Sequence, residues 1–156
     1  MKGLSKITKL LNNFVKTIDE ELFVEEDSDF AYYPSSNKIT YSLVVSEKDN
    51  ADFMQSVEFF NPSVKCDIFL WSILHEIGHH ETIDELSEFD LEKSELIKFL
   101  ATGGAISEKR YYECPDERAA TGWAVQYAES HTAILAEFWE KLQKAIMRFY
   151  KLNHIC

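Results

Sequence analysis

Apolar residues recur every three or four positions along most of the chain, which predicts a mostly helical protein. The stretches with this spacing cover about residues 4–23, 46–60, 63–81 and 83–102, with further helices starting at Pro115 and at Ser130. In the last helix, the spacing predicts that six residues face inward. They are Ile134, Leu135, Phe138, Leu142, Ile146 and Phe149.

Local signals predict where several of these helices begin and end. Ser46-Glu-Lys-Asp49 resembles a capping box, with Asp in place of the usual Glu or Gln. We expect Asn61-Pro62 to end the 46–60 helix and to open the next one, with Asn61 at the N-cap and Pro62 at the first helical position. Gly103-Gly104 should end the fourth helix.

Two short stretches instead carry the aromatic and β-branched residues typical of strands. Residues 30–34 and 38–45 are separated by Pro34-Ser-Ser-Asn37, which predicts a hairpin. No other strand is clear, so the sheet should be small, with an open edge. We therefore expect an α+β, mostly helical fold in which the hairpin (about residues 30–45) packs near the 63–81 helix, within a single domain of residues 1–156.

Composition limits the possible partners and location. The 156 residues are 46% hydrophobic, as in a globular protein, and carry a net charge of −11. That charge argues against nucleic acid or an anionic membrane as the partner. No apolar run reaches the 18 or so residues that span a bilayer. The three cysteines (Cys66, Cys114 and Cys156) form no C-x-x-C motif and indicate reduced thiols in the cytoplasm.

The third helix contains His75-Glu76-Ile77-Gly78-His79, a match to H-E-x-x-H. The two histidines lie one helical turn apart, so both imidazoles can bind one ion. Glu76 lies about 100° around the helix from His75, close enough to hold a water molecule at the metal. Two nitrogen ligands, an open position and an adjacent carboxylate are what a zinc hydrolase needs, so we predict one Zn²⁺ per chain.

A catalytic zinc has three protein ligands, and no further histidine follows His79 at the required spacing. The best candidate is Glu117, in the first turn of the helix that starts at Pro115, where the helix dipole favours an anionic side chain. Asp116 is its main competitor, and Glu113, which precedes the helix, is a weaker one. Three alanines on the face of Glu117 should let this helix approach Gly78 closely. They are Ala120, Ala124 and Ala128.

His-Glu-Ile-Gly-His followed by Glu-x-x-Ala on a later helix resembles the gluzincin-type zincin metallopeptidases. Small size and an upstream hairpin are most similar to the compact intracellular ImmA/IrrE-like and phage-encoded members. The resemblance covers roughly residues 30–130 and implies a zincin-like fold, His75, His79 and Glu117 as metal ligands, and Glu76 as general base. The chain departs from the pattern because 37 residues, with an extra helix, separate His79 from Glu117.

We therefore expect a zinc metallopeptidase that cleaves a peptide or protein substrate, with Glu76 assisting the attack of a zinc-bound water. The negatively charged oxygen that forms when water attacks the peptide carbonyl (the oxyanion) needs a further hydrogen-bond donor. The exposed edge of the 38–45 strand offers a place for an extended peptide. The alternative is a non-catalytic zinc-binding regulatory or interaction protein with the same fold. The candidate oxyanion donors are Tyr127 and His131, or Tyr111 and Tyr112.

Overall fold

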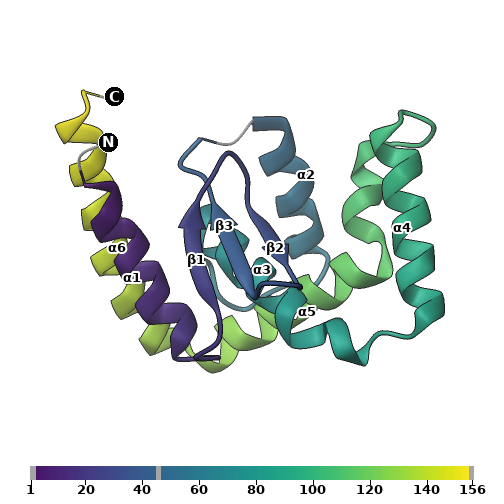
Figure 1. Cartoon of the computed structure of the whole chain (residues 1–156), viewed down its shortest axis with the longest axis horizontal. Coiled ribbons are helices and arrows are strands. Elements are labelled where there is room, and N and C mark those ends of the chain that lie inside the picture. Colours follow the sequence, from purple (N-terminus) through teal and green to yellow (C-terminus); the bar gives the residue numbers. More distant parts are fainter. Residues whose placement is uncertain (1–2, 45–46, 155–156) are drawn as a thin grey trace. The chain divides into compact units, whose positions relative to one another are not determined.

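Helices make up most of the structure, a computed structural model that describes residues 3–44 and 47–154 (Figure 1). The predicted α+β, mostly helical fold with a small sheet is confirmed. The chain forms two compact units, one comprising the chain up to Ser42 together with the chain from His131 onward, and the other Leu43–Ser130. The elements are α1 (Leu4–Lys16), β1 (Phe23–Glu26), β2 (Ala31–Tyr33), β3 (Lys38–Tyr41), α2 (Glu47–Glu58), α3 (Ile68–Thr82), η1 (Ile83–Glu85), α4 (Glu88–Thr102), η2 (Glu108–Glu113), α5 (Pro115–Ser130) and α6 (Thr132–Leu152).

The sheet of the first unit has three strands in the order β1-β3-β2. The predicted hairpin is present as the antiparallel pair β2–β3, and Asn37 adopts a left-handed conformation (φ 53°) in its turn, as asparagine does readily. β1 pairs parallel to β3 on the other side. The expectation of an exposed edge on the 38–45 strand is therefore wrong for Lys38–Tyr41, because both edges of β3 are paired. The packing of the hairpin near the 68–82 helix stays a prediction.

β1 begins at Phe23, the last residue that the helical spacing had assigned to the first helix. α1 ends at Lys16 rather than near residue 23. The side chain of Asn12, on α1, donates to the carbonyl of Val24 (2.9 Å) and accepts from its N–H (2.8 Å), as a neighbouring strand would. These two bonds satisfy polar groups at the outer edge of β1, so they stabilise a strand that pairs on one side only.

The long helices α1 and α6 lie side by side in the first unit (Figure 1). The rings of Phe14 and Phe138 stack between them, with centroids 4.2 Å apart. Five of the six α6 residues expected to face inward are buried, but Ile134 is 55% exposed, so that part of the prediction is wrong. The described lysines of α1 (Lys6, Lys9 and Lys16) lie on its exposed side.

In the second unit, α2 ends where expected but α3 begins later. Asn61 has a left-handed conformation (φ 47°), and its N–H donates to the carbonyl of Glu58, which closes the end of α2. That conformation is incompatible with an N-cap, so the prediction that Asn61 opens the next helix is wrong. Asp67 caps α3 instead, accepting from the N–H of Phe69 at 2.9 Å. The predicted capping box lies partly at Ser46, outside the described residues.

The helices α3 and α5 touch through their backbones. A Cβ added to Gly78 would lie 2.2 Å from the carbonyl oxygen of Ala120, so only glycine fits there. The face of α5 that meets α3 is made of small buried residues, as the alanine spacing predicted. They are Ala120, Ala124 and Ala128. This contact positions the side chains of the two helices against each other.

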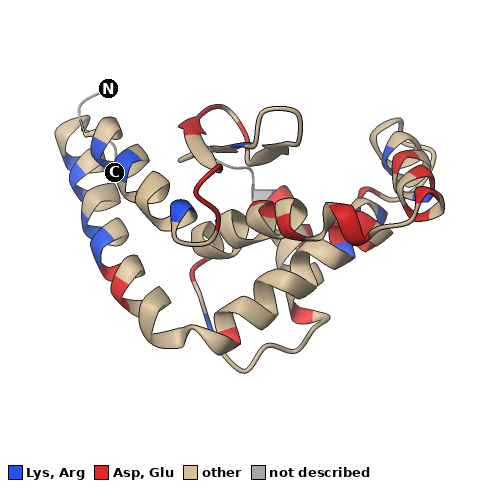
Figure 2. Cartoon of the chain, turned by 60° about the horizontal axis from the view of Figure 1, so that its bottom comes forward, with Lys and Arg blue, Asp and Glu red and all other residues tan. Residues whose placement is uncertain are grey.

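The segment between α3 and α5 folds as the short η1 followed by α4. Ser87 caps α4 by accepting from the N–H of Asp90, and Gly103 ends it, as predicted. Asp and Glu outnumber Lys and Arg in this unit, which accounts for the red of α4 and its neighbours in Figure 2. In the described part of the chain, no helix is both long and apolar enough to span a membrane.

We predict that Gly78→Ala destabilises the protein by about 1–3 kcal/mol, because the added methyl forces α3 and α5 apart. The better helix propensity of alanine offsets only about 1 kcal/mol. Urea unfolding monitored by circular dichroism measures this. Gly122→Ala is the matched control on α5, because its added Cβ would meet only the ring of Phe60 at 3.2 Å, which can shift. Equal stability of wild type and Gly78→Ala would contradict the assigned role of this contact.

Candidate metal centre

His75, His79 and Glu117 meet where α3 and α5 touch. One ligand atom from each side chain can be chosen so that all three lie within 4.8 Å of one another. His75 Nε2 is 3.4 Å from Glu117 Oε1, and His79 Nε2 contacts Glu117 Oε2. His75 and Glu117 are buried, and the side chain of His79 is 18% exposed. The structure therefore brings together the three residues that the sequence suggested as metal ligands.

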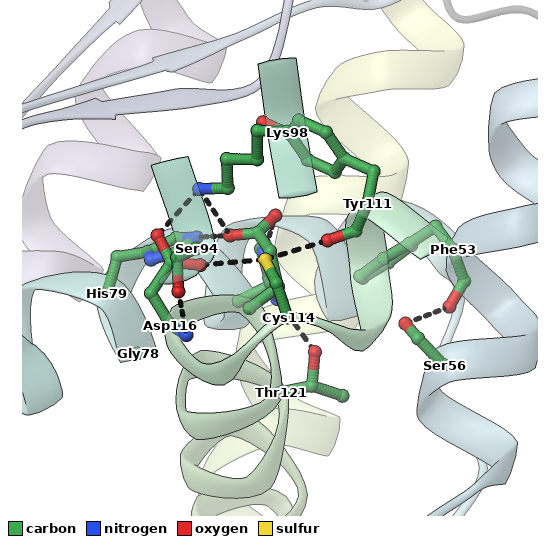
Figure 3. Close-up of polar contacts among 12 residues, drawn as sticks. Phe53, Ser56, Gly78, His79, Ser94, Lys98, Tyr111, Cys114, Asp116 and Thr121 are labelled. Carbon is green, nitrogen blue, oxygen red and sulfur yellow. Dashed lines mark hydrogen bonds and ion pairs between the residues drawn. The ribbon is translucent and has the colours of Figure 1, made fainter. Parts of the chain in front are cut away.

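The ring of His75 is held in one orientation by neighbours on two helices. Thr121, one turn after Glu117 on α5, hydrogen-bonds His75 Nδ1 at 2.9 Å (Figure 3). Phe53 of α2 packs edge-on against the same ring, with centroids 5.2 Å apart. Because Nδ1 is engaged, Nε2 is the nitrogen directed at Glu117. A metal on Nε2 would leave the proton on Nδ1, which would then donate to Thr121.

The charges in this cluster are strongly coupled. Burial opposes ionisation of Glu117, but His75 and His79 outweigh it and hold the pKa of this carboxyl well below 4.5. Burial likewise opposes the charged form of His79, but Glu117 raises the pKa of its imidazole above 6.5. Burial raises the pKa of the Glu76 carboxyl, which also interacts with the charges of His75, His79 and Glu117. Glu76 is thus buried close to the cluster without belonging to the ligand group.

The residues fit a divalent metal ion. Glu117 Oε2 is buried and accepts no hydrogen bond of good geometry, although His79 Nε2 contacts it and Lys98 Nζ lies 3.5 Å away, and a bound cation would satisfy it fully. Ligand atoms around a tetrahedral zinc lie about 3.3 Å apart, close to the 3.4 Å between His75 Nε2 and Glu117 Oε1. Two neutral imidazoles and one carboxylate are also the ligand set of catalytic zinc sites that keep a fourth position open.

Asp116, the main competing ligand, is held in a hydrogen-bond network beside the cluster (Figure 3). Its Oδ2 accepts from Lys98 Nζ at 2.6 Å, and its Oδ1 accepts from the thiol of Cys114 at 3.0 Å. Cys114 also donates to the carbonyl of Tyr111, and burial raises the pKa of its thiol to about 12. A protonated, hydrogen-bonded thiol is a poor ligand, so Cys114 belongs to this network and not to the cluster.

Most of the other candidate residues contact neighbours outside the ligand group. Lys98 Nζ is 5.2 Å from the centre of the Tyr111 ring, and burial and Glu117 raise the pKa of Tyr111 to about 12. Tyr112 packs against Phe53, which places both tyrosines of η2 beside the cluster. Tyr127 stacks on Trp123, Glu113 pairs with Arg110, and His131 precedes α6 in the other unit. The role of Tyr127 and His131 as oxyanion donors stays a prediction.

Sequence reasoning did not identify two of the residues that surround the cluster, Thr121 and Lys98. Thr121 lies four positions after Glu117, and this spacing places both on one face of α5, so the face itself could have suggested it. Lys98 lies on a separate helix, and nothing in its sequence neighbourhood links it to Glu117.

Comparisons of the chain with protein-family models, curated proteins and solved structures found no match. The interpretation of this site therefore rests on its own residues and their geometry.

We predict that Thr121→Val weakens zinc binding by about tenfold or more, because His75 loses the partner that fixes its ring. The measurement is zinc affinity by competition with a chromophoric chelator. Thr82→Val is the control, since Thr82 is also buried but its hydroxyl bonds the carbonyl of Gly78 instead of a candidate ligand. If both variants bound zinc as tightly as wild type, Thr121 would not orient the site.

For the metal-free protein, we predict that stability falls as the pH rises above 6.5. His79 has a raised pKa, so its contribution is complete below 6.5 and is lost as the pH rises through that raised pKa. The raised pKa of Glu76 acts in the same direction, whereas the lowered pKa of Glu117 matters only below 4.5. Urea unfolding across a pH series tests this.

Zinc should reverse the trend, because it binds the deprotonated imidazoles and its stabilising effect grows with pH. His79→Gln should show a smaller fall without zinc, because only the contribution of Glu76 remains, and should lose most of the gain with zinc. A metal-free stability that rises with pH in this range would contradict the assigned coupling of His79 and Glu117.

Proposed function

We propose that the protein is a zinc-dependent metallopeptidase. The observation that carries this proposal is the convergence of His75, His79 and Glu117 beside a fourth buried group, Glu76, that is not one of the ligands. A site that only held the fold together would favour four protein ligands and would not need a buried carboxylate next to an open position. Zinc is the metal that two imidazoles and one carboxylate suit best in a hydrolytic site.

The chain's own residues then have distinct roles. When bound, zinc would supply a Lewis acid that polarises a peptide carbonyl and acidifies a coordinated water. Glu76 accepts a proton from the attacking water and delivers it to the departing amine. Burial of Glu76 favours its protonated form between these two steps, which suits a group that must hold the proton and then release it.

A pocket in the same unit offers a place for a substrate side chain. It has a volume of about 120 Å³, and Tyr112, Phe59 and Arg118 are among the residues that line it, whereas the candidate ligands and Glu76 do not. The ring of Phe53 contacts both Tyr112, which lines the pocket, and His75 of the cluster. We infer that this pocket, rather than the edge of β3, receives part of a peptide substrate.

We also propose that the protein is related to the gluzincin-type zincins, which it resembles, and that it lies in the cytoplasm. His-Glu-Ile-Gly-His and Glu-x-x-Ala support the first, and the described thiols of Cys66 and Cys114, both free, are compatible with the second. A peptide or protein would be the substrate.

We predict that Glu76→Gln binds zinc with an affinity within about threefold of wild type but loses peptidase activity by about a thousandfold. The change removes the proton acceptor and keeps the shape of the side chain. Zinc content by atomic absorption and cleavage of casein and of a fluorogenic peptide library measure the two properties. Treatment of wild type with a chelator should abolish cleavage, and added zinc should restore it.

Glu117→Gln serves as the comparison, because it should lose zinc and activity together. A zinc-loaded wild type that cleaves no polypeptide would overturn the peptidase proposal and leave a zinc-binding regulatory protein. If Glu76→Gln cleaved as fast as wild type, the general base would have to be a different group.

A further inference from the structure

Lys98 places a positive charge beside the candidate ligand Glu117. It lies on α4, in the segment that separates the two ligand-bearing helices in the sequence. Its Nζ is 2.6 Å from Asp116 Oδ2 and 3.5 Å from Glu117 Oε2 (Figure 3). Its side chain is only 25% exposed, so solvent screens these interactions weakly. One ammonium thus faces two adjacent carboxylates, of which only Glu117 belongs to the ligand group.

Asp116 is fixed from several directions in its present orientation. Its N–H, at the start of α5, donates to Ser94 Oγ at 3.1 Å, and Ser94 is one turn before Lys98 on α4. The Cys114 thiol donates to the other carboxylate oxygen. α4 therefore holds the main chain of Asp116 through Ser94 and its carboxylate through Lys98.

Without Lys98, Asp116 would be a partly buried carboxylate with one charged partner fewer. A divalent cation at His75, His79 and Glu117 would then attract it, because Asp116 directly precedes Glu117 in the first turn of α5. Coordination by Asp116 would occupy the position that a hydrolytic site needs for water. The position of Glu117 would change little, since the contact of α5 with Gly78 fixes its backbone.

We propose that Lys98 is a positioning residue that keeps Asp116 from coordinating the metal and so preserves the open coordination position. The inference rests on the proposed function, because the open position matters only for a hydrolytic site. It also assigns a role to the helix inserted between the ligands: α4 supplies the cation that distinguishes one carboxylate from its neighbour.

Three variants test this proposal. Lys98→Met removes the charge and keeps the length of the side chain, and Lys98→Met/Asp116→Asn also removes the carboxylate that would be freed. Ser94→Ala is the matched control, since it loosens the hold of α4 on Asp116 and leaves the charge of Lys98 in place.

The first readout is zinc affinity by chelator competition, and the second is the visible spectrum of the cobalt-substituted protein, which reports coordination geometry. We expect Lys98→Met to bind zinc about tenfold more tightly and to lose visible absorption intensity in the cobalt form, because a ligand is added. Its peptidase activity should fall by about tenfold or more. The double variant should return all three properties toward wild type, and Ser94→Ala should show no gain in affinity.

Weaker zinc binding in both Lys98→Met and the double variant, with unchanged cobalt spectra, would overturn the proposal and make Lys98 a structural ion-pair partner. If Lys98→Met does not fold, Lys98→Gln takes its place under the same criteria. A wild type that binds zinc but cleaves no peptide would refute the peptidase function alone, because the affinity and spectral measurements still decide the role of Lys98.

Discussion

The site depends on one close backbone contact between α3 and α5. Gly78 leaves room for the main chain of Ala120, and any larger residue would push the helices apart. Because Glu117 lies one turn before this contact and His75 and His79 lie on either side of Gly78, the approach of the helices sets the spacing of the three side chains. Thr121, next to Ala120, reaches His75 for the same reason. The glycine directly before the second histidine of H-E-x-x-H is thus a structural requirement as much as part of a motif.

Without a metal, the carboxylate and the imidazoles of the cluster already stabilise one another. The carboxylate of Glu117 is stabilised by the imidazoles, and His79 gains affinity for a proton in return. A proton on His79 Nε2 would lie against Glu117 Oε2 but would not engage His75, whose Nε2 is 3.4 Å from Glu117 Oε1, so it satisfies the site only in part. A divalent ion would replace that proton and engage all three groups. The folded chain therefore presents a preformed site in which a proton and a metal compete.

Sequence reasoning named residues that the structure brings together where each depended on its own helix. The H-E-x-x-H spacing suggested His75 and His79, and the first turn of α5 suggested Glu117. It did not identify Lys98, because the contact of Lys98 with Glu117 depends on how α4 packs against α5, which no local pattern encodes. β1 was missed because it is four residues long, ends in two glutamates and follows apolar residues that fit a helix. The start of α3 was misplaced because Asn61 adopts a left-handed conformation that ends one helix instead of opening the next.

The hydrogen bonds from Asn12 to Val24 affect how the small sheet can meet other molecules. A strand edge with unsatisfied main-chain groups is a template on which foreign chains can assemble, including in amyloid. Asn12 occupies this template on β1 at Val24 with an amide from the same chain, and β2 forms the opposite edge among the described strands. That edge spans just Ala31–Tyr33, with Lys38 lying over the ring of Tyr33, and a short edge next to a positive charge is a poor starting point for aggregation.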